Sequence, residues 1–138
     1  MTEPLPSLPL AEALLAMVSN DVDGDDIGVY NADSPRDGSG KYVVFYFDTG
    51  LKSAFHRNLV NGGPNDLRYQ TTCVGVGPEQ VAWVADKVAA SLLAGIPAVA
   101  GRRVWPTVQE ASQTARRDDT STGFWLATSQ WLTRSDAA

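Results

Sequence analysis

Carboxylates that suit a calcium ion gather in one short stretch of the sequence, Asp21-Val22-Asp23-Gly24-Asp25-Asp26. An EF-hand loop needs a glycine at its sixth position, for a sharp turn, and a glutamate at its twelfth that binds the ion through both oxygens. Counting from Asp21, those positions hold Asp26 and Ala32. We therefore expect no metal site here and interpret the stretch as a solvated turn that ends a helix.

A nucleophile and a nucleotide-binding loop each have one candidate position. His56 is the only histidine and Cys73 the only cysteine, so a Cys–His pair is conceivable. Cys73 lies in a strand-like segment, however, where a cysteine is usually a buried and unreactive small hydrophobe. Gly75-Val76-Gly77 is similar to the start of a nucleotide-binding turn, but Gln80 stands at the third glycine position and no Walker lysine follows. We interpret it as a tight turn and expect no cofactor.

Asp48-Thr49-Gly50 has the order of the catalytic triplet of aspartic proteases, in which two aspartates share one proton. Retroviral-type examples are of similar length and pair their aspartates by dimerising. That family also needs an apolar strand ending in glycine near the end of the chain, whereas Leu92-Leu93-Ala94-Gly95 here closes a helix. A turn after a strand is the ordinary explanation of the triplet. A small aspartyl-protease-like enzyme that uses Asp48 is therefore a distant alternative.

The composition is typical of one folded domain: 138 residues, of which 43% are hydrophobic and 20% charged. The net charge of −5 argues against a surface that tracks nucleic acid along its whole length, since such domains are usually basic. A single cysteine excludes an intramolecular disulfide and a zinc site built on several thiolates. Neither a signal-peptide pattern nor an apolar run of membrane length is present, so we expect a soluble protein from a reducing compartment.

Residues 66–95 form the predicted centre of the fold, a strand that passes through one tight turn into an amphipathic helix. Leu67 to Val76 is rich in β-branched and aromatic residues, which favour strands. Pro78 suits the first helical turn, and Gly95 followed by Pro97 is a stop signal. Between them apolar residues recur at helical spacing: Val81, Val84, Ala85, Val88, Leu92 and Leu93.

The other elements follow from the same kinds of pattern. Lys41 to Asp48 is the clearest strand and is apolar on both alternations, which indicates burial on both faces or packing against a partner. A long connection follows it over residues 49–65. The remaining expectations are a helix over 9–19, a weak strand over 27–32, a strand broken by Pro106 over 102–108, a hairpin loop over 110–122 and a closing strand over 123–133.

This order of elements predicts an α+β fold with one mixed, mostly antiparallel sheet of about four to five strands packed against two helices. We divide the chain into three parts. Residues 1–8 are an extended, proline-stiffened arm, residues 9–133 a single domain, and residues 134–138 a short polar tail.

Four tryptophans are many for a chain of this length: Trp83, Trp105, Trp125 and Trp131. Trp125 and Trp131 share one face of the closing strand. Exposed aromatic side chains anchor interfaces, but a second layer of core is an equally ordinary explanation. Because none of the motifs above forms an active site, a role in assembly gains weight.

Two segments carry a resemblance to a known family, Tyr69-Gln70-Thr71-Thr72-Cys73-Val74-Gly75 and Gln80-Val81-Ala82-Trp83-Val84-Ala85-Asp86-Lys87-Val88. They resemble the tail terminator proteins of long-tailed, siphovirus-type phages of actinobacteria. Tyr42 to Gly50 and a final strand after an arginine-bearing loop fit the same pattern. The likeness spans roughly residues 9–133, while the first eight residues and the run from Asp21 to Asp26 lie outside the pattern.

The resemblance implies an α+β subunit of a hexameric ring that caps the tail tube and offers a surface to the connector of the head. It implies no catalysis and no cofactor. The partners would be further copies of the chain, the tail tube protein and a head-side connector or stopper protein, with no membrane. Genome DNA would pass through the lumen, where negative charge repels its phosphates. Such a protein is made in the host cytoplasm and ends in the virion; another neck component is the alternative.

The expected contacts of such a ring lie in the loops and on the closing strand. His56 and Arg57 lie in the long connection, which we expect to reach a neighbouring subunit or the tube. Arg116 and Arg117 lie in the predicted hairpin loop. Trp125 and Trp131 are the candidate aromatic anchors.

Overall fold

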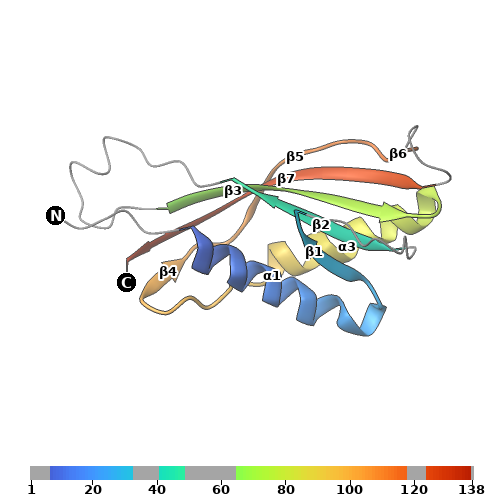
Figure 1. Ribbon diagram of the computed structural model, residues 1–138. Helices are drawn as coiled ribbons and strands as arrows, with labels where there is room; N and C mark the ends of the chain where they lie inside the picture. Colours follow the sequence, from blue (N-terminus) through green and yellow to red (C-terminus); the bar gives the residue numbers. More distant parts are fainter. Residues whose placement is uncertain (1–6, 33–40, 49–64, 118–123, 138) are drawn as a thin grey trace.

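In the computed structural model the described residues are 7–32, 41–48, 65–117 and 124–137 (Figure 1). They form two α-helices, a short 3-10 helix and seven strands. In chain order these are α1 (Leu8–Val22), η1 (Asp23–Asp25), β1 (Gly28–Asn31), β2 (Tyr42–Phe47), β3 (Asn65–Gly75), α3 (Pro78–Ala94), β4 (Arg102–Val104), β5 (Val108–Ser112), β6 (Arg116–Arg117) and β7 (Trp125–Ala137).

The seven strands form one sheet with the main order β1-β2-β3-β7-β4, and β5 and β6 also pair with β7. β1 runs parallel to β2, and every other pairing is antiparallel. This confirms the predicted α+β class and the mixed, mostly antiparallel sheet. The sheet has seven strands rather than four to five, because the segment after α3 contributes three short strands where one was expected.

β3 and β7 are the longest strands and pair along the whole of β3, from Asn65 opposite Ser135 to Gly75 opposite Trp125. The other edge of β7 is covered in turn by β4, β5 and β6. The break between β4 and β5 contains Pro106, which has no N–H to give to the ladder. Before that break the Trp105 N–H still donates to the Arg134 carbonyl at 2.9 Å.

Both helices cover one face of the sheet, and the core lies between the two layers (Figure 1). The predicted stripe of α3 is confirmed, since Val81, Val84, Val88 and Leu92 are completely buried. Each such side chain contributes about 1.5–3 kcal/mol before conformational entropy is counted. Leu93 is different. It was placed on this stripe, but it lies just beyond the core-facing row and is 50% exposed.

α1 supplies the other half of the helical layer through Leu10, Leu14, Val18 and Val22, which recur every fourth residue and are buried. The helix is longer than the predicted 9–19 because Val22 continues this row and still faces the core. Leu8, assigned to the extended arm, is already helical. In the described part of the chain neither helix is long and apolar enough to cross a bilayer.

The end of the chain differs most from expectation. Residues 110–112 and 116–117 belong to strands, although 110–122 was predicted as a loop. Residues 134–137, expected to be a polar tail, continue β7. The sequence has no apolar pattern in this part of the strand, because the inward-facing residues are polar. Thr133 and Ser135 face the core and are completely buried. Both residues pair with β3, and Ser135 also pairs with Val104 on β4.

Candidate interaction surface

The face of the sheet turned away from the helices is one candidate surface. Alternate residues of β2, β3 and β7 point to it, among them Tyr46, Arg68, Gln70, Gln130 and Leu132. Tyr46 is 44% exposed, although Val44 on the same side of β2 is buried. Burial on both faces, one of the two predictions for this strand, therefore holds for Val43, Val44 and Phe45 but not for its end.

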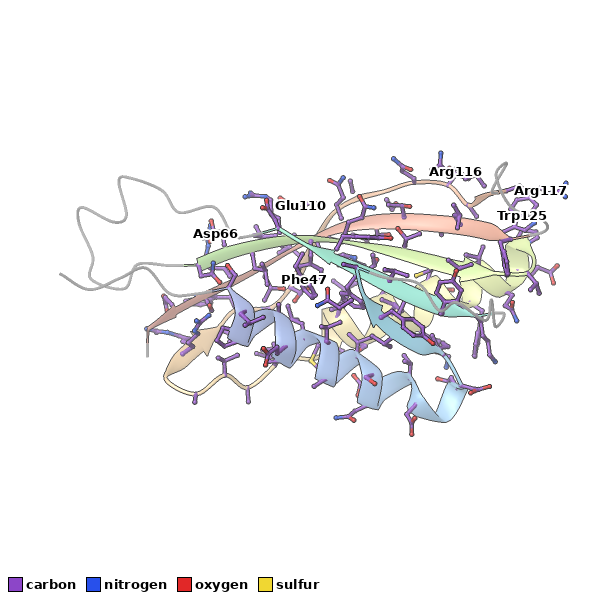
Figure 2. All side chains as sticks on the ribbon, viewed as in Figure 1. Phe47, Asp66, Glu110, Arg116, Arg117 and Trp125 are labelled. Carbon is purple, nitrogen blue, oxygen red and sulfur yellow. The ribbon has the colours of Figure 1, made fainter. Side chains whose placement is uncertain are left out.

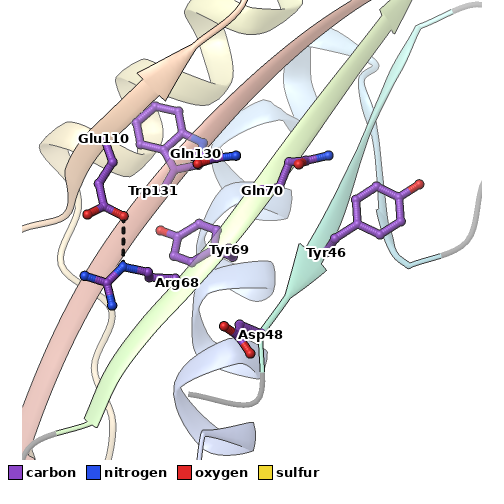
Figure 3. Close-up of a pocket in the computed structure, with 8 residues that line it drawn as sticks. All are labelled: Tyr46, Asp48, Arg68, Tyr69, Gln70, Glu110, Gln130 and Trp131. Atoms are coloured by element: carbon purple, nitrogen blue, oxygen red, sulfur yellow. Dashed lines mark hydrogen bonds and ion pairs between the residues drawn. The ribbon is translucent and has the colours of Figure 1, made fainter. Parts of the chain in front are cut away.

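A shallow hollow of about 260 Å³ lies on this face, where β2, β3, β7 and β5 meet (Figure 3). Arg68 Nε reaches Glu110 Oε1 at 3.2 Å across its rim. Both side chains are well exposed, so this ion pair stabilises the fold by less than about 1 kcal/mol. Asp48 and Glu110 are the carboxylates among the described lining residues, and Glu110 is already paired with an arginine.

A second, larger hollow of about 510 Å³ lies beside the break between β4 and β5. Trp105, Pro106, Val108 and Leu132 supply its apolar wall. Trp105 is 44% exposed and Val108 55% exposed, which is a large apolar area to leave in water. The Arg103 guanidinium lies 5.6 Å from the Trp105 ring centre, in the arrangement of a cation–π contact. Exposed aromatic and arginine side chains in one patch are typical of interface centres.

Two ion pairs between directly opposed residues tie the same end of the sheet together. Arg134 on β7 donates to both oxygens of Asp66 on β3, at 2.6 and 3.0 Å. These hydrogen bonds, with the negative charge of Asp66, raise the pKa of Arg134. Arg103 on β4 donates to Asp136 on β7 at 3.3 Å. This end of the face therefore presents fixed charges of both signs.

The structure describes the surroundings of two of the candidate chemical groups, Cys73 and the turn at Val76. Cys73 is buried in the core, and burial raises the pKa of its thiol to about 12, so it is not a thiolate nucleophile at neutral pH. His56 lies outside the described residues. The Val76 N–H, which in a phosphate-binding turn would point at a phosphate, donates to Gln80 Oε1 at 2.8 Å. The side chain of Gln80, at the position of the third glycine, thus accepts the N–H that a phosphate would otherwise bind.

Asp48 and the acidic run form no cluster that could bind a metal. The Asp48 side chain is exposed at the end of β2, and its N–H donates to the Arg68 carbonyl at 2.9 Å. In the acidic run Asp21 accepts a 2.6 Å hydrogen bond from Ser91, and Asp25 lies 3.9 Å from Lys87. Within the described ranges no three His, Cys, Asp or Glu side chains come close enough to hold a metal ion.

The fold, but not the sequence, has a recognisable counterpart. No known family model and no curated protein sequence matches this chain. A chain in the solved virion of a native gene transfer agent (GTA) particle superposes with a TM-score of 0.65. The likeness covers 92% of this chain and 97% of that chain, with 18% identity. At this identity the likeness establishes a shared fold.

The expected contact residues have different environments. Arg116 and Arg117 are exposed on β6, at one end of the sheet (Figure 2). Trp125 is half-buried against the edge of the core. Trp131 is 1% exposed, so of the two explanations offered for it the core is the correct one, and it is no surface anchor. Arg57, like His56, lies outside the described residues and remains a prediction.

Sequence reasoning did not select Tyr46, Trp105 or Val108 as contact residues, although Trp105 was noted among the four tryptophans; all three supply exposed apolar area near the two hollows. Trp105 carried a signal, because the proline that follows it has no N–H to give to the ladder and so places Trp105 beside a break in the strand. Tyr46 carried none, since its neighbours on the same strand are apolar and buried.

Proposed function

We propose that this chain is a structural protein of a phage-like virion, and within it the tail terminator, which forms a ring that caps the tail tube. The likeness to a component of a gene transfer agent virion carries the proposal, because it spans nearly the whole of both chains. A fold shared over an entire subunit fits a shared architectural role better than a small common motif would.

The finer role rests on the sequence. The segments Tyr69–Gly75 and Gln80–Val88, which resemble tail terminators, form β3 and the first part of α3, the strand–turn–helix unit at the centre of this fold. Exposed Trp105, Val108 and Tyr46 supply apolar area of the kind that partner proteins cover. The partners would be further copies in a ring, the tube protein and the head-side connector.

The proposed role needs no catalytic group and no cofactor. Asp48 has no second aspartate beside it among the described residues that line the first hollow, and Cys73 is buried. The net charge of −5 would favour passage of DNA through a ring, because phosphates are repelled by carboxylates. No base-reading contact is part of the proposal.

The test compares binding to purified tail tubes with binding to portal complexes, and both are measured by sedimentation. A terminator binds tubes and stops their further growth when it is added to polymerising tube protein. Binding to portals without binding to tubes would instead assign the chain to the other side of the neck, as a connector or head-completion protein. The particle likeness alone is compatible with that second role.

A further inference from the structure

The strand register places residues of the two outer edges of the sheet on common rows. Gly28 on β1 is opposite Tyr42, Tyr42 opposite Val74, Val74 opposite Leu126, and Leu126 opposite Arg116 on β6. One row thus crosses the entire sheet from β1 to β6. A second row runs from Asn31 on β1, by way of Phe45, Thr71 and Ser129, to Ser112 at the end of β5.

Both edges lack a further strand partner among the described residues. β1 pairs with β2 alone, and β5 and β6 pair with β7 alone. Such an edge presents backbone N–H and C=O groups that can pair with another strand. The pairing directions also fit, because β6 runs antiparallel to β1 when the sheet directions are followed across.

The described charged side chains near the two ends of this row have opposite signs. Arg116 and Arg117 on β6 are exposed, and neither forms an ion pair with a described residue. At the β1 edge, Asp23 and Asp26 lie in the turn that leads directly into the strand, and both are exposed. Asp25 beside them lies 3.9 Å from Lys87, so its charge is partly offset.

We infer that copies of this chain associate head to tail through these edges, with β6 and the end of β5 of one copy against β1 of the next. Arg116 is on the row of Gly28, the first residue of β1, and Arg117 is one position further towards the turn that holds Asp23 and Asp26. An interface between two different edges is heterologous, and it generates a ring when the rotation between copies closes. Opposite charges then set the register and disfavour pairing of like edges.

This inference rests on the proposed function, because it concerns how neighbours touch within the proposed ring. It can nevertheless be tested separately, by cross-linking introduced cysteines. Asn31 and Ser112 are exposed, uncharged and on one row, so Asn31→Cys/Ser112→Cys keeps every charge of the contact. The natural Cys73 is buried and is not reached by a maleimide in the folded protein.

The chain carrying both changes is treated with a short bis-maleimide at high protein concentration, with and without tail tubes. We expect a ladder of cross-linked multimers. The matched control is Asn31→Cys/Arg103→Cys, which uses an exposed residue of β4 on the same edge. The rows of Ser112 and Arg103 lie about 23 Å apart along β7, so the control should stay monomeric.

Charge reversal tests the proposed register. In the Asn31→Cys/Ser112→Cys chain, Arg116→Glu or Asp23→Lys alone should lower the cross-linked fraction about tenfold, and the two together should restore most of it. Asp118 and Asp119, which follow Arg117 in the sequence, stay unchanged in all variants. No ladder, dimers from either single cysteine alone, or no recovery in the combined variant would each overturn the inference.

The outcomes keep the two proposals apart. A ladder in solution from a chain that does not cap tubes would support the edge contact and remove the terminator function. Capped tubes without cross-links between residues 31 and 112 would support the terminator function and remove the edge contact.

Discussion

Trp131 on β7 donates a hydrogen bond from its indole Nε1 to Thr71 Oγ1 on β3, at 2.9 Å. Both residues are buried, and they join the two longest strands on the side that faces the helices. A tryptophan can be buried this deeply because its one polar atom has a partner. From the sequence, Trp131 was a candidate surface anchor. The alternation of a strand shows which residues share a face, but it does not show which face packs against the core.

Replacing this side chain tests the assignment. Trp131→Phe removes the hydrogen bond and part of the ring, so we expect it to lower the free energy of unfolding by about 1–3 kcal/mol. Trp105→Phe is the matched control, since Trp105 is well exposed, and it should cost less than about 1 kcal/mol. Urea unfolding followed by circular dichroism measures both. Equal losses would contradict the placement of Trp131 in the core.

The turn between β3 and α3 provides a paired test on glycines. A Cβ on Gly75 would lie 2.8 Å from the Val81 backbone nitrogen, whereas a Cβ on Gly77 would meet nothing within 4 Å. We expect Gly75→Ala to destabilise the protein by about 1–3 kcal/mol, because backbone must shift to relieve the contact. Gly77→Ala should stay within about 0.5 kcal/mol of the parent, since its φ of −159° suits any residue. The midpoints of urea unfolding curves decide between them.

Stability should fall in alkaline solution through Cys73. Burial raises the pKa of its thiol from 9.0 to about 12, so between these pH values the unfolded chain loses a proton that the folded protein keeps. The unfolded state then binds fewer protons, and the free energy of unfolding decreases with pH by up to about 1.4 kcal/mol per unit. Burial also raises the pKa of Tyr69, which acts in the same direction.

Urea unfolding between pH 8 and pH 11 measures this slope. Cys73→Ala is the control, because it removes the contribution of the thiol and should leave a shallower decline. A slope that does not change in the variant would show that Cys73 is not the group responsible.

Asp48→Asn separates a structural role from an enzymatic one. The side chain is exposed and the backbone hydrogen bond to Arg68 does not need it, so the variant should fold and assemble like the parent. Sedimentation with tail tubes and a general peptidase assay are the two measurements. Peptidase activity in the parent that disappears in the variant would reopen the aspartic-protease alternative.

The elements with strong periodicity could be predicted from sequence, and those held by pairing alone could not. Val81, Val84, Val88 and Leu92 mark α3 by their spacing. Strand β6 consists of two arginines, and no local pattern distinguishes them from a loop. They are a strand because the long β7 offers them an unpaired edge.

The candidate surface was predictable only in part, for a related reason. Arg116 and Arg117 could be proposed as contacts from their charge. Their relation to Asp23 and Asp26 could not, because it depends on the register of strands that are distant in the sequence. Trp105 likewise becomes a surface residue through the pairing of β4 with β7, which places it two residues after Arg103 on the outer face, beside the second hollow.

The central claim is that this protein caps tail tubes, and imaging tests it most directly. Purified protein is mixed with purified tail tubes, and the product is examined by electron microscopy while the mass of the free protein is measured in solution. The account predicts a ring at one end of each tube, whatever the mass of the free protein. Tubes that stay bare at both ends in the presence of folded protein would contradict it.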